Sequence, residues 1–190
     1  IKGLVDTPYW TSTEALFAEE LPSSLVVIGS SVVALEIAQA YARLGSRVTI
    51  LARHTLLYAE DPLLGEKLAE CFEKEGIRVL NNTQASHVSY DSNGFSLETN
   101  EGTLIAEKLL ISTGRHANTG KLGLENVGVE TDKSGAIVVN SMMETSTANI
   151  YAAGDCSNMP QFVYVAAAAG SRAGINMTGG NAQLDLSTMP

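Results

Sequence analysis

The stretch Leu25-Val-Val-Ile-Gly29-Ser-Ser31-Val-Val-Ala34-Leu-Glu36 decides the fold of this chain. A run of apolar residues, typical of a buried strand, ends at a glycine; two small residues follow, and a helical pattern then begins. Backbone N–H groups at such a helix start attract phosphate, because they have no intrahelical partner and lie at the positive end of the helix dipole. The stretch therefore predicts a strand–turn–helix unit that holds the pyrophosphate of a dinucleotide.

The glycine pattern of this turn departs from the dinucleotide-binding fingerprint G-x-G-x-x-G/A. Gly29 is kept, Ser30 follows it, Ser31 replaces the second glycine and Ala34 occupies the third place. Taken alone, a pattern reduced in this way fits an ordinary strand-to-helix turn about as well as a nucleotide site. Its interpretation depends on the rest of the chain.

The cofactor preference is predicted at the end of the next strand, residues 47–52. An NAD-dependent enzyme commonly places a carboxylate about 20 residues beyond the first glycine, where it binds the ribose 2′-hydroxyl. This chain has Ala52 there, followed by Arg53 and His54. A guanidinium is suited to a 2′-phosphate and an imidazole can add a donor, so we predict a preference for NADPH. The alternative is a solvated Arg-His pair at a strand end.

Alternating strand and helix patterns continue beyond this unit and predict an α/β fold. Helices are expected over residues 31–44 and 62–75, each followed by a glycine. Three short segments separated by Asn-Gly and Glu-Gly turns predict an antiparallel meander. We expect a Rossmann-like NAD(P)-binding domain whose parallel sheet carries helices on one side and this meander on the other. The strands are predicted over residues 25–28, 47–52, 77–80, 86–90, 95–99, 103–105 and 108–112.

The remaining segments are less regular. A short helix is expected over residues 13–20, with Ser12 or Thr13 as its cap. Residues 116–148 are rich in small polar residues and predict loops. A strand over 150–153 and a helix over 162–177 complete the prediction. These C-terminal elements are expected to belong to a second domain.

Two further carboxylates are candidate site residues. Glu36 follows the small-residue turn on the predicted helix, where it either complements the helix dipole or faces a nicotinamide. Asp155 follows Gly154 at the end of the predicted strand over 150–153. Cofactors bind at the carboxyl edge of sheets in α/β folds, and an aspartate there can accept hydrogen bonds from a polyol. A plain turn is the alternative.

Composition limits the classes of partner. The 190 residues have a net charge of -9 and 45% hydrophobic residues, which favours a globular protein and disfavours nucleic acid or an anionic membrane as partner. Apolar runs stay short of the ~18–20 residues of a membrane span. The chain has two cysteines, Cys71 and Cys156, in no CxxC pattern; we expect buried packing residues, no metal site and a reducing, cytoplasmic setting.

Three motifs in this order resemble the flavin-dependent pyridine nucleotide–disulfide oxidoreductases. They are the nucleotide turn at Gly29, the strand that ends in Thr113-Gly114-Arg115, and the Gly154-Asp155 pair. The resemblance covers essentially the whole chain. It implies a connecting arm from the FAD domain at 1–21, an NADP-binding domain at 22–115 and the C-terminal part of the FAD-binding domain at 116–190.

The resemblance also implies roles for individual residues. Asp155 and the backbone of Val163 would contact FAD, and Glu36 would lie near the nicotinamide. No catalytic residue is expected in this chain. The residues expected to line the NADPH site are Gly29, Ser30, Ser31, Ala34, Arg53, His54 and Gly114.

Within the family, the stretches Thr7-Pro-Tyr-Trp-Thr-Ser-Thr-Glu-Ala-Leu16 and Pro160-Gln-Phe-Val-Tyr-Val-Ala-Ala-Ala-Ala-Gly170 resemble most the NADPH- and FAD-dependent enzymes that reduce Hg(II) to Hg(0). That branch implies a homodimer and a thiolate-bound Hg(II) substrate. The redox-active cysteine pair of the family has no counterpart here, so we expect an internal fragment that is inactive alone. The alternatives are a fragment of a lipoamide dehydrogenase or glutathione reductase type enzyme, and a non-catalytic nucleotide-binding module.

Overall fold

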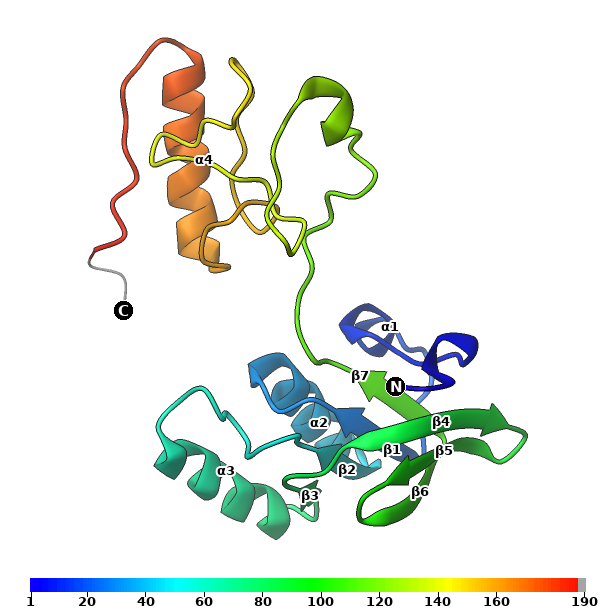
Figure 1. Cartoon of the computed structure of the whole chain (residues 1–190). Helices are drawn as coiled ribbons and strands as arrows, with labels where there is room; N and C mark the ends of the chain where they lie inside the picture. The colour runs from blue at the N-terminus through cyan, green and yellow to red at the C-terminus, as the bar shows by residue number, and fades with distance from the viewer. Residues whose placement is uncertain (188–190) are drawn as a thin grey trace. The chain divides into compact units, whose positions relative to one another are not determined.

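The computed structural model describes residues 1–187. The chain divides into two compact units, the first comprising Ile1–Gly114 and the second beginning at Arg115 (Figure 1). Each unit has its own buried apolar residues, which do not mix with those of the other.

A four-stranded parallel sheet forms the centre of the first unit. Its strands lie in the order β3-β2-β1-β7, so β1 is flanked by β2 and β7. Because the strands are parallel, their carboxyl ends meet at one edge of the sheet. The strands are β1 (Ser24–Ile28), β2 (Arg47–Leu51), β3 (Arg78–Leu80) and β7 (Lys108–Ile111).

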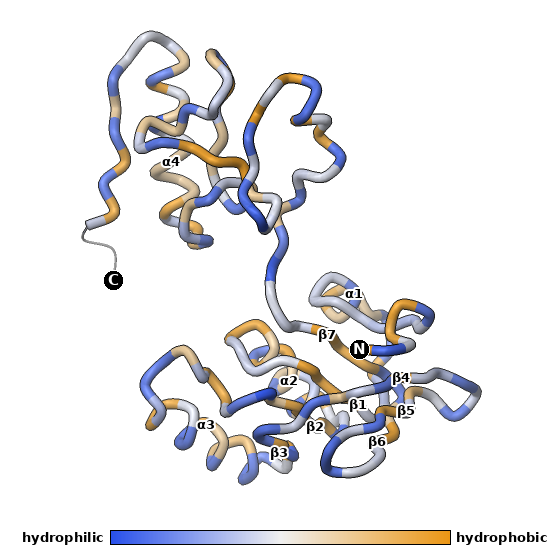
Figure 2. Tube along the Cα trace, viewed as in Figure 1, coloured by the Kyte–Doolittle hydropathy of each residue, from blue (hydrophilic) through white to orange (hydrophobic). Residues whose placement is uncertain are grey.

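Two helices cover one face of this sheet, α2 (Val32–Leu44) and α3 (Pro62–Lys74). Successive side chains of a strand point to opposite faces, and Leu25 and Val27 of β1 lie in the core on the helical side. Figure 2 shows apolar residues along β1, as expected for a strand that is covered on both faces. Gly45 ends α2 in a left-handed conformation with φ 116°, as its sequence position predicts.

An antiparallel meander covers the other face. Val26 and Ile28 of β1 pack there against Phe95 and Leu97, both of which have no exposed surface. The predicted α/β class, with helices on one side of the parallel sheet and the meander on the other, is therefore confirmed. The meander strands are β4 (Ala85–Asp91), β5 (Gly94–Thr99) and β6 (Gly102–Ala106), in that order.

The N-terminal arm packs within the first unit through η1 (Leu4–Asp6), α1 (Ser12–Leu16) and two β-bridges, one between Lys2 and His87 and one between Trp10 and Leu110. Trp10 donates its N–H to the Leu109 carbonyl and accepts from Ile111, both at 2.8 Å. The predicted helix over 13–20 is wrong in extent and in its cap. Thr11 is the N-cap, since it forms a capping box with Glu14, and the helix ends after five residues.

The second unit contains η2 (Leu124–Val127), α4 (Val163–Met177) and long irregular segments. The predicted strand over 150–153 is wrong: Tyr151 forms one isolated bridge with Glu144, and no ladder continues from it among the described residues. An apolar run forms a strand only where a neighbouring segment supplies successive hydrogen bonds. Its side chains still enter the core, which includes Met143, Ala152 and Ala169.

A buried glycine lets α3 approach the loop that precedes it. A Cβ on Gly65 would lie 2.2 Å from the main-chain oxygen of Leu56. Only a shift of α3 can relieve this clash. We expect Gly65→Ala to lower the free energy of unfolding by about 2 kcal/mol, because overpacking outweighs the gain in helix propensity. Gly170→Ala in α4 is the control, since nothing lies within 4 Å of its Cβ position, and should stabilise by about 0.5–1 kcal/mol. Urea unfolding measures both; a Gly65→Ala variant as stable as the wild type would contradict this packing.

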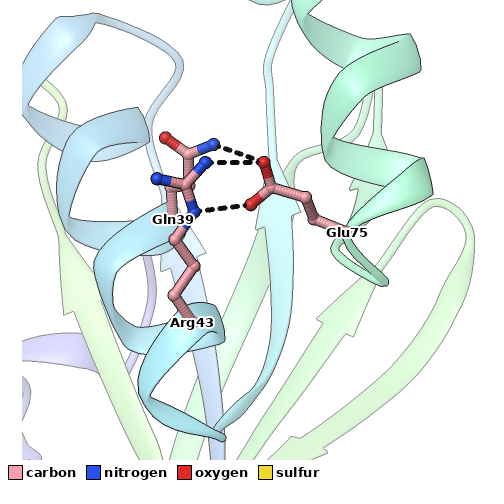
Figure 3. Close-up of polar contacts among 3 residues, drawn as sticks. All are labelled: Gln39, Arg43 and Glu75. Atoms are coloured by element: carbon pink, nitrogen blue, oxygen red, sulfur yellow. Dashed lines mark hydrogen bonds and ion pairs between the residues drawn. The ribbon is translucent and has the colours of Figure 1, made fainter.

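A charged cluster joins the exposed sides of α2 and α3 (Figure 3). Arg43 donates from Nη2 and Nε to the two carboxylate oxygens of Glu75, at 2.7 and 2.9 Å, and Gln39 adds a third bond at 2.9 Å. The hydrogen bonds from Arg43 lower the pKa of Glu75. Because this pKa is lowered on folding, the interaction stabilises the folded state at pH values above the pKa of Glu75 in the unfolded chain. The stabilisation is lost as the pH falls through the pKa of Glu75 in the folded chain.

We therefore expect Arg43→Gln to raise the pKa of Glu75 toward its ordinary value, because the principal donors to its carboxylate are removed. NMR titration of the Glu75 side-chain carboxyl measures the shift. Lys67→Gln is the control, as it removes a separate ion pair with Glu70 on α3 and should leave the titration of Glu75 unchanged. An unaltered Glu75 curve in the Arg43 variant would contradict the assignment.

Candidate functional site

The nucleotide turn lies at the carboxyl end of the central strand β1. Gly29 has φ 145° and donates its N–H to the Leu51 carbonyl at 3.1 Å. A Cβ at this position would lie 2.2 Å from the main-chain oxygen of Ser112, just beyond β7. The glycine is therefore required by the close approach of the neighbouring strand end as well as by its own backbone conformation.

The start of α2 has the features of an anion site. Ser31 is the N-cap residue, with extended backbone, and its side chain makes no capping hydrogen bond. Ala34 is fully buried beneath the turn, where a larger side chain would separate the helix from the strand. Among residues 1–187 no side chain accepts from the first-turn N–H groups of α2, so these donors are available to a phosphate.

A cationic side chain lies at the end of the adjacent strand. Arg53 is exposed directly after the buried Ala52, and no ion pair to it occurs within the described part of the chain. The ring of His54 lies against that of Tyr58, with centroids 4.5 Å apart and planes inclined by 31°. Because β1 and β2 are parallel neighbours, Arg53 lies at the same sheet edge as Gly29.

A main-chain hydrogen bond ties this loop to the turn. Leu57 donates its N–H to the Ser30 carbonyl at 2.9 Å, and Leu57 adopts a left-handed backbone conformation with φ 49°. The loop that carries Arg53 is thereby fixed against the turn that precedes α2. No signal in the sequence predicts this contact, because it depends on the backbone conformation of a leucine that no local motif marks.

Gly114 and Glu36 have fewer contacts within this chain. Gly114 lies beyond β7 with φ 159°, and a Cβ there would meet nothing within 4 Å, so no close approach of another atom requires the glycine. Glu36 is exposed on α2 and forms no ion pair within residues 1–187. Both lie near the edge where the turn and Arg53 meet, because Gly114 follows β7 and Glu36 lies in the early part of α2.

The second unit holds Asp155 on a tight turn. Gly154 has φ 84°, and its carbonyl accepts from both the N–H and the Oγ of Ser157, at 3.0 and 2.8 Å. The carboxylate of Asp155 accepts a 2.8 Å hydrogen bond from Nη1 of Arg115. Arg115 belongs to the Thr-Gly-Arg motif, but 40 positions of sequence separate it from Asp155, so no local spacing predicts a role for it in a site.

The N-terminus of α4 lies against this turn. A Cβ on Gly154 would lie 3.6 Å from the Cβ of Ala166, which is in the first turns of the helix. Val163 is 89% exposed, and the rings of Phe162 and Tyr164 stack beside it with centroids 5.3 Å apart. No side chain among residues 1–187 caps the helix, so its first N–H groups are available to a hydrogen-bond acceptor.

Both cysteines are less buried than the sequence predicts. Cys156 is half-buried and donates its S–H to the Ala153 carbonyl at 3.4 Å. Cys71 is exposed, so the prediction of a buried residue there is wrong, because α3 turns Phe72 and Gly65 toward the core instead. No group of three or more metal-ligating side chains occurs within residues 1–187, and no helix there has the length and apolar character to cross a membrane.

Comparison with known proteins decides the family. The family model described as pyridine nucleotide-disulphide oxidoreductase matches residues 1–170. The chain belongs to this family. This confirms the resemblance drawn from the nucleotide turn, the Thr-Gly-Arg segment and the Gly-Asp pair.

Among curated members of the family, the mercuric reductase of Shewanella putrefaciens is 76% identical over 190 residues, all of this chain. The mercuric reductase of Acidithiobacillus ferrooxidans is 61% identical over the same length. The chain spans 34% and 35% of these two relatives, about a third of their length.

Solved structures of the family share the fold. The Cu(II) complex of the HOCl-induced flavoprotein disulfide reductase RclA from Escherichia coli superposes with a TM-score of 0.88 at 30% identity, over 96% of this chain and 43% of that one. The fold of a flavoprotein disulfide reductase is therefore kept over nearly all of this chain.

Proposed function

We propose that this chain is the NADPH-binding domain and the C-terminal part of the FAD-binding domain of a mercuric reductase, which reduces Hg(II) to Hg(0) in mercury detoxification. The observation that carries the proposal is the 76% identity along the whole chain to an enzyme of that name. As the resemblance implies, the full-length enzyme would act as a cytoplasmic homodimer. Its redox-active cysteines would lie in the two thirds of the relatives that this chain does not span.

The geometry of the first unit fits NADPH. An uncapped helix start, a turn without a Cβ and an exposed cation share one sheet edge. The N–H groups of α2 would hold the pyrophosphate, and Arg53 with His54 would bind the 2′-phosphate. Glu36, on the exposed side of α2, would lie near the nicotinamide.

The geometry of the second unit fits part of an FAD site. Asp155 would accept a hydrogen bond from a hydroxyl of the ribityl chain, and the uncapped start of α4 at Val163 would direct its N–H groups and helix dipole at negative charge on the flavin. When bound, the two cofactors supply hydride and electron transfer. The residues of this chain bind and orient them and carry no step of the chemistry themselves.

The test uses the full-length protein that contains this chain. With NADPH and thiol-bound Hg(II), we expect NADPH oxidation coupled to release of volatile Hg(0), and slower oxidation with NADH. Oxidised lipoamide and glutathione disulfide serve as competing substrates, and turnover of either without reduction of Hg(II) would overturn the proposal in favour of another disulfide reductase. Nucleotide binding without any redox turnover would indicate a binding module.

A further inference from the structure

The ion pair between Arg115 and Asp155 connects two segments of the second unit that are distant in sequence. Nη1 of Arg115 lies 2.8 Å from Oδ2 of Asp155, and the two side chains are 57% and 50% exposed. Ion pairs exposed to this degree contribute little to folding stability, because solvent screens them and the side chains lose entropy. A contribution to folding stability therefore does not explain this ion pair.

The backbone of Asp155 is fixed independently of this pair. Ser157 closes the turn through two hydrogen bonds to the Gly154 carbonyl, and Ile137 donates to the Cys156 carbonyl at 2.8 Å. The carboxylate itself has one hydrogen-bond partner among the described residues, and that partner is Arg115. Arg115 therefore selects the side-chain orientation of an aspartate whose backbone is already in place.

The two carboxylate oxygens of Asp155 differ in their hydrogen bonding. Oδ2 accepts from Arg115, whereas no hydrogen bond to Oδ1 occurs within residues 1–187. A carboxylate held in this way offers one oxygen in a defined direction to a hydroxyl donor. We infer that Arg115 is a positioning residue for Asp155, orienting it toward a hydroxyl of a polyol chain. This inference rests on the proposed function, in which that polyol is the ribityl chain of FAD.

The experiment measures FAD affinity by flavin fluorescence after the flavin is removed from the full-length protein and titrated back. We expect Arg115→Ala to weaken FAD binding about tenfold, as for the loss of one charge-assisted hydrogen bond, with the thermal unfolding midpoint unchanged. Arg115→Lys should recover most of the affinity, because an ammonium can replace the single bond to Oδ2. Lys121→Ala removes the same charge from an exposed position of the same unit and should leave FAD binding unchanged.

A double-mutant cycle separates positioning from a general effect of charge. In an Asp155→Asn background, Arg115→Ala should weaken FAD binding less than twofold, since the residue on which Arg115 acts has already been altered. The inference would be overturned if Arg115→Ala matched Lys121→Ala, if Arg115→Lys were as weak as Arg115→Ala, or if the tenfold loss persisted beside Asp155→Asn. Failure of the wild-type protein to bind FAD would instead overturn the proposed function, and this inference with it.

Discussion

Gly29→Ala is expected to lower the free energy of unfolding by about 3 kcal/mol and to weaken NADPH binding by at least tenfold. A Cβ would lie 2.2 Å from the Ser112 oxygen and 2.8 Å from its carbonyl carbon. Both are main-chain atoms, so the end of β7 or the turn itself must move. Overpacking of this kind costs ~1–3 kcal/mol, and a positive φ adds ~1–3 kcal/mol of backbone strain.

Gly76→Ala is the matched control. Gly76 has φ 80°, but a Cβ there would meet nothing within 4 Å, so this variant carries strain without a clash. It should destabilise by about 1 kcal/mol and leave NADPH affinity unchanged. Urea unfolding and calorimetric titration with NADPH measure the two effects. If Gly29→Ala and Gly76→Ala behaved alike, the approach of β7 would not be the reason for the glycine.

Arg53→Glu should weaken NADPH binding about 100-fold and NADH binding less than threefold. A hydrogen bond to a charged group contributes ~1.5–3 kcal/mol, and the introduced carboxylate would also repel a 2′-phosphate. NADH lacks that phosphate, so the change should matter little to it. Calorimetric titration with both nucleotides gives the ratio of the NADPH to the NADH dissociation constant, which should rise in the variant.

Arg47→Glu provides the control for charge. Arg47 lies at the opposite end of the same strand, is exposed and forms no ion pair within residues 1–187. The substitution changes net charge equally at the amino edge of the sheet, so both affinities should fall alike and only slightly. Equal losses of NADPH and NADH binding in Arg53→Glu would show that Arg53 does not contact the 2′-phosphate.

The fold of the first unit could be predicted because its signals are local. Apolar periodicity, closing glycines such as Gly45 and the turn at Gly94 mark the elements, and each agrees with the tertiary structure. The prediction of a strand over 150–153 was wrong, because an apolar run does not indicate whether a partner strand lies beside it. The helix after Thr11 was predicted too long for a similar reason, since the pattern does not fix where the chain leaves the core.

The candidate site was predictable only in part. Gly29 and Arg53 follow strands whose order along the chain places them at one edge, so their proximity could be derived. Three of its features are tertiary contacts: Gly29 against Ser112, the ring of His54 against that of Tyr58, and Asp155 paired with Arg115. No spacing in the sequence encodes these contacts, because each depends on how separate segments approach.

The hydrogen bond from Leu57 to Ser30 has a consequence for engineering. It is a main-chain contact, so the path of the loop from β2 to α3 is set by backbone geometry rather than by the side chains that face solvent. Arg53, His54 and Tyr58 are exposed on that path and can be exchanged without disturbing it. Redesign of cofactor choice in this chain should therefore succeed by substituting side chains at fixed loop length, whereas grafting a longer or shorter loop would break the register that holds the cation beside the turn.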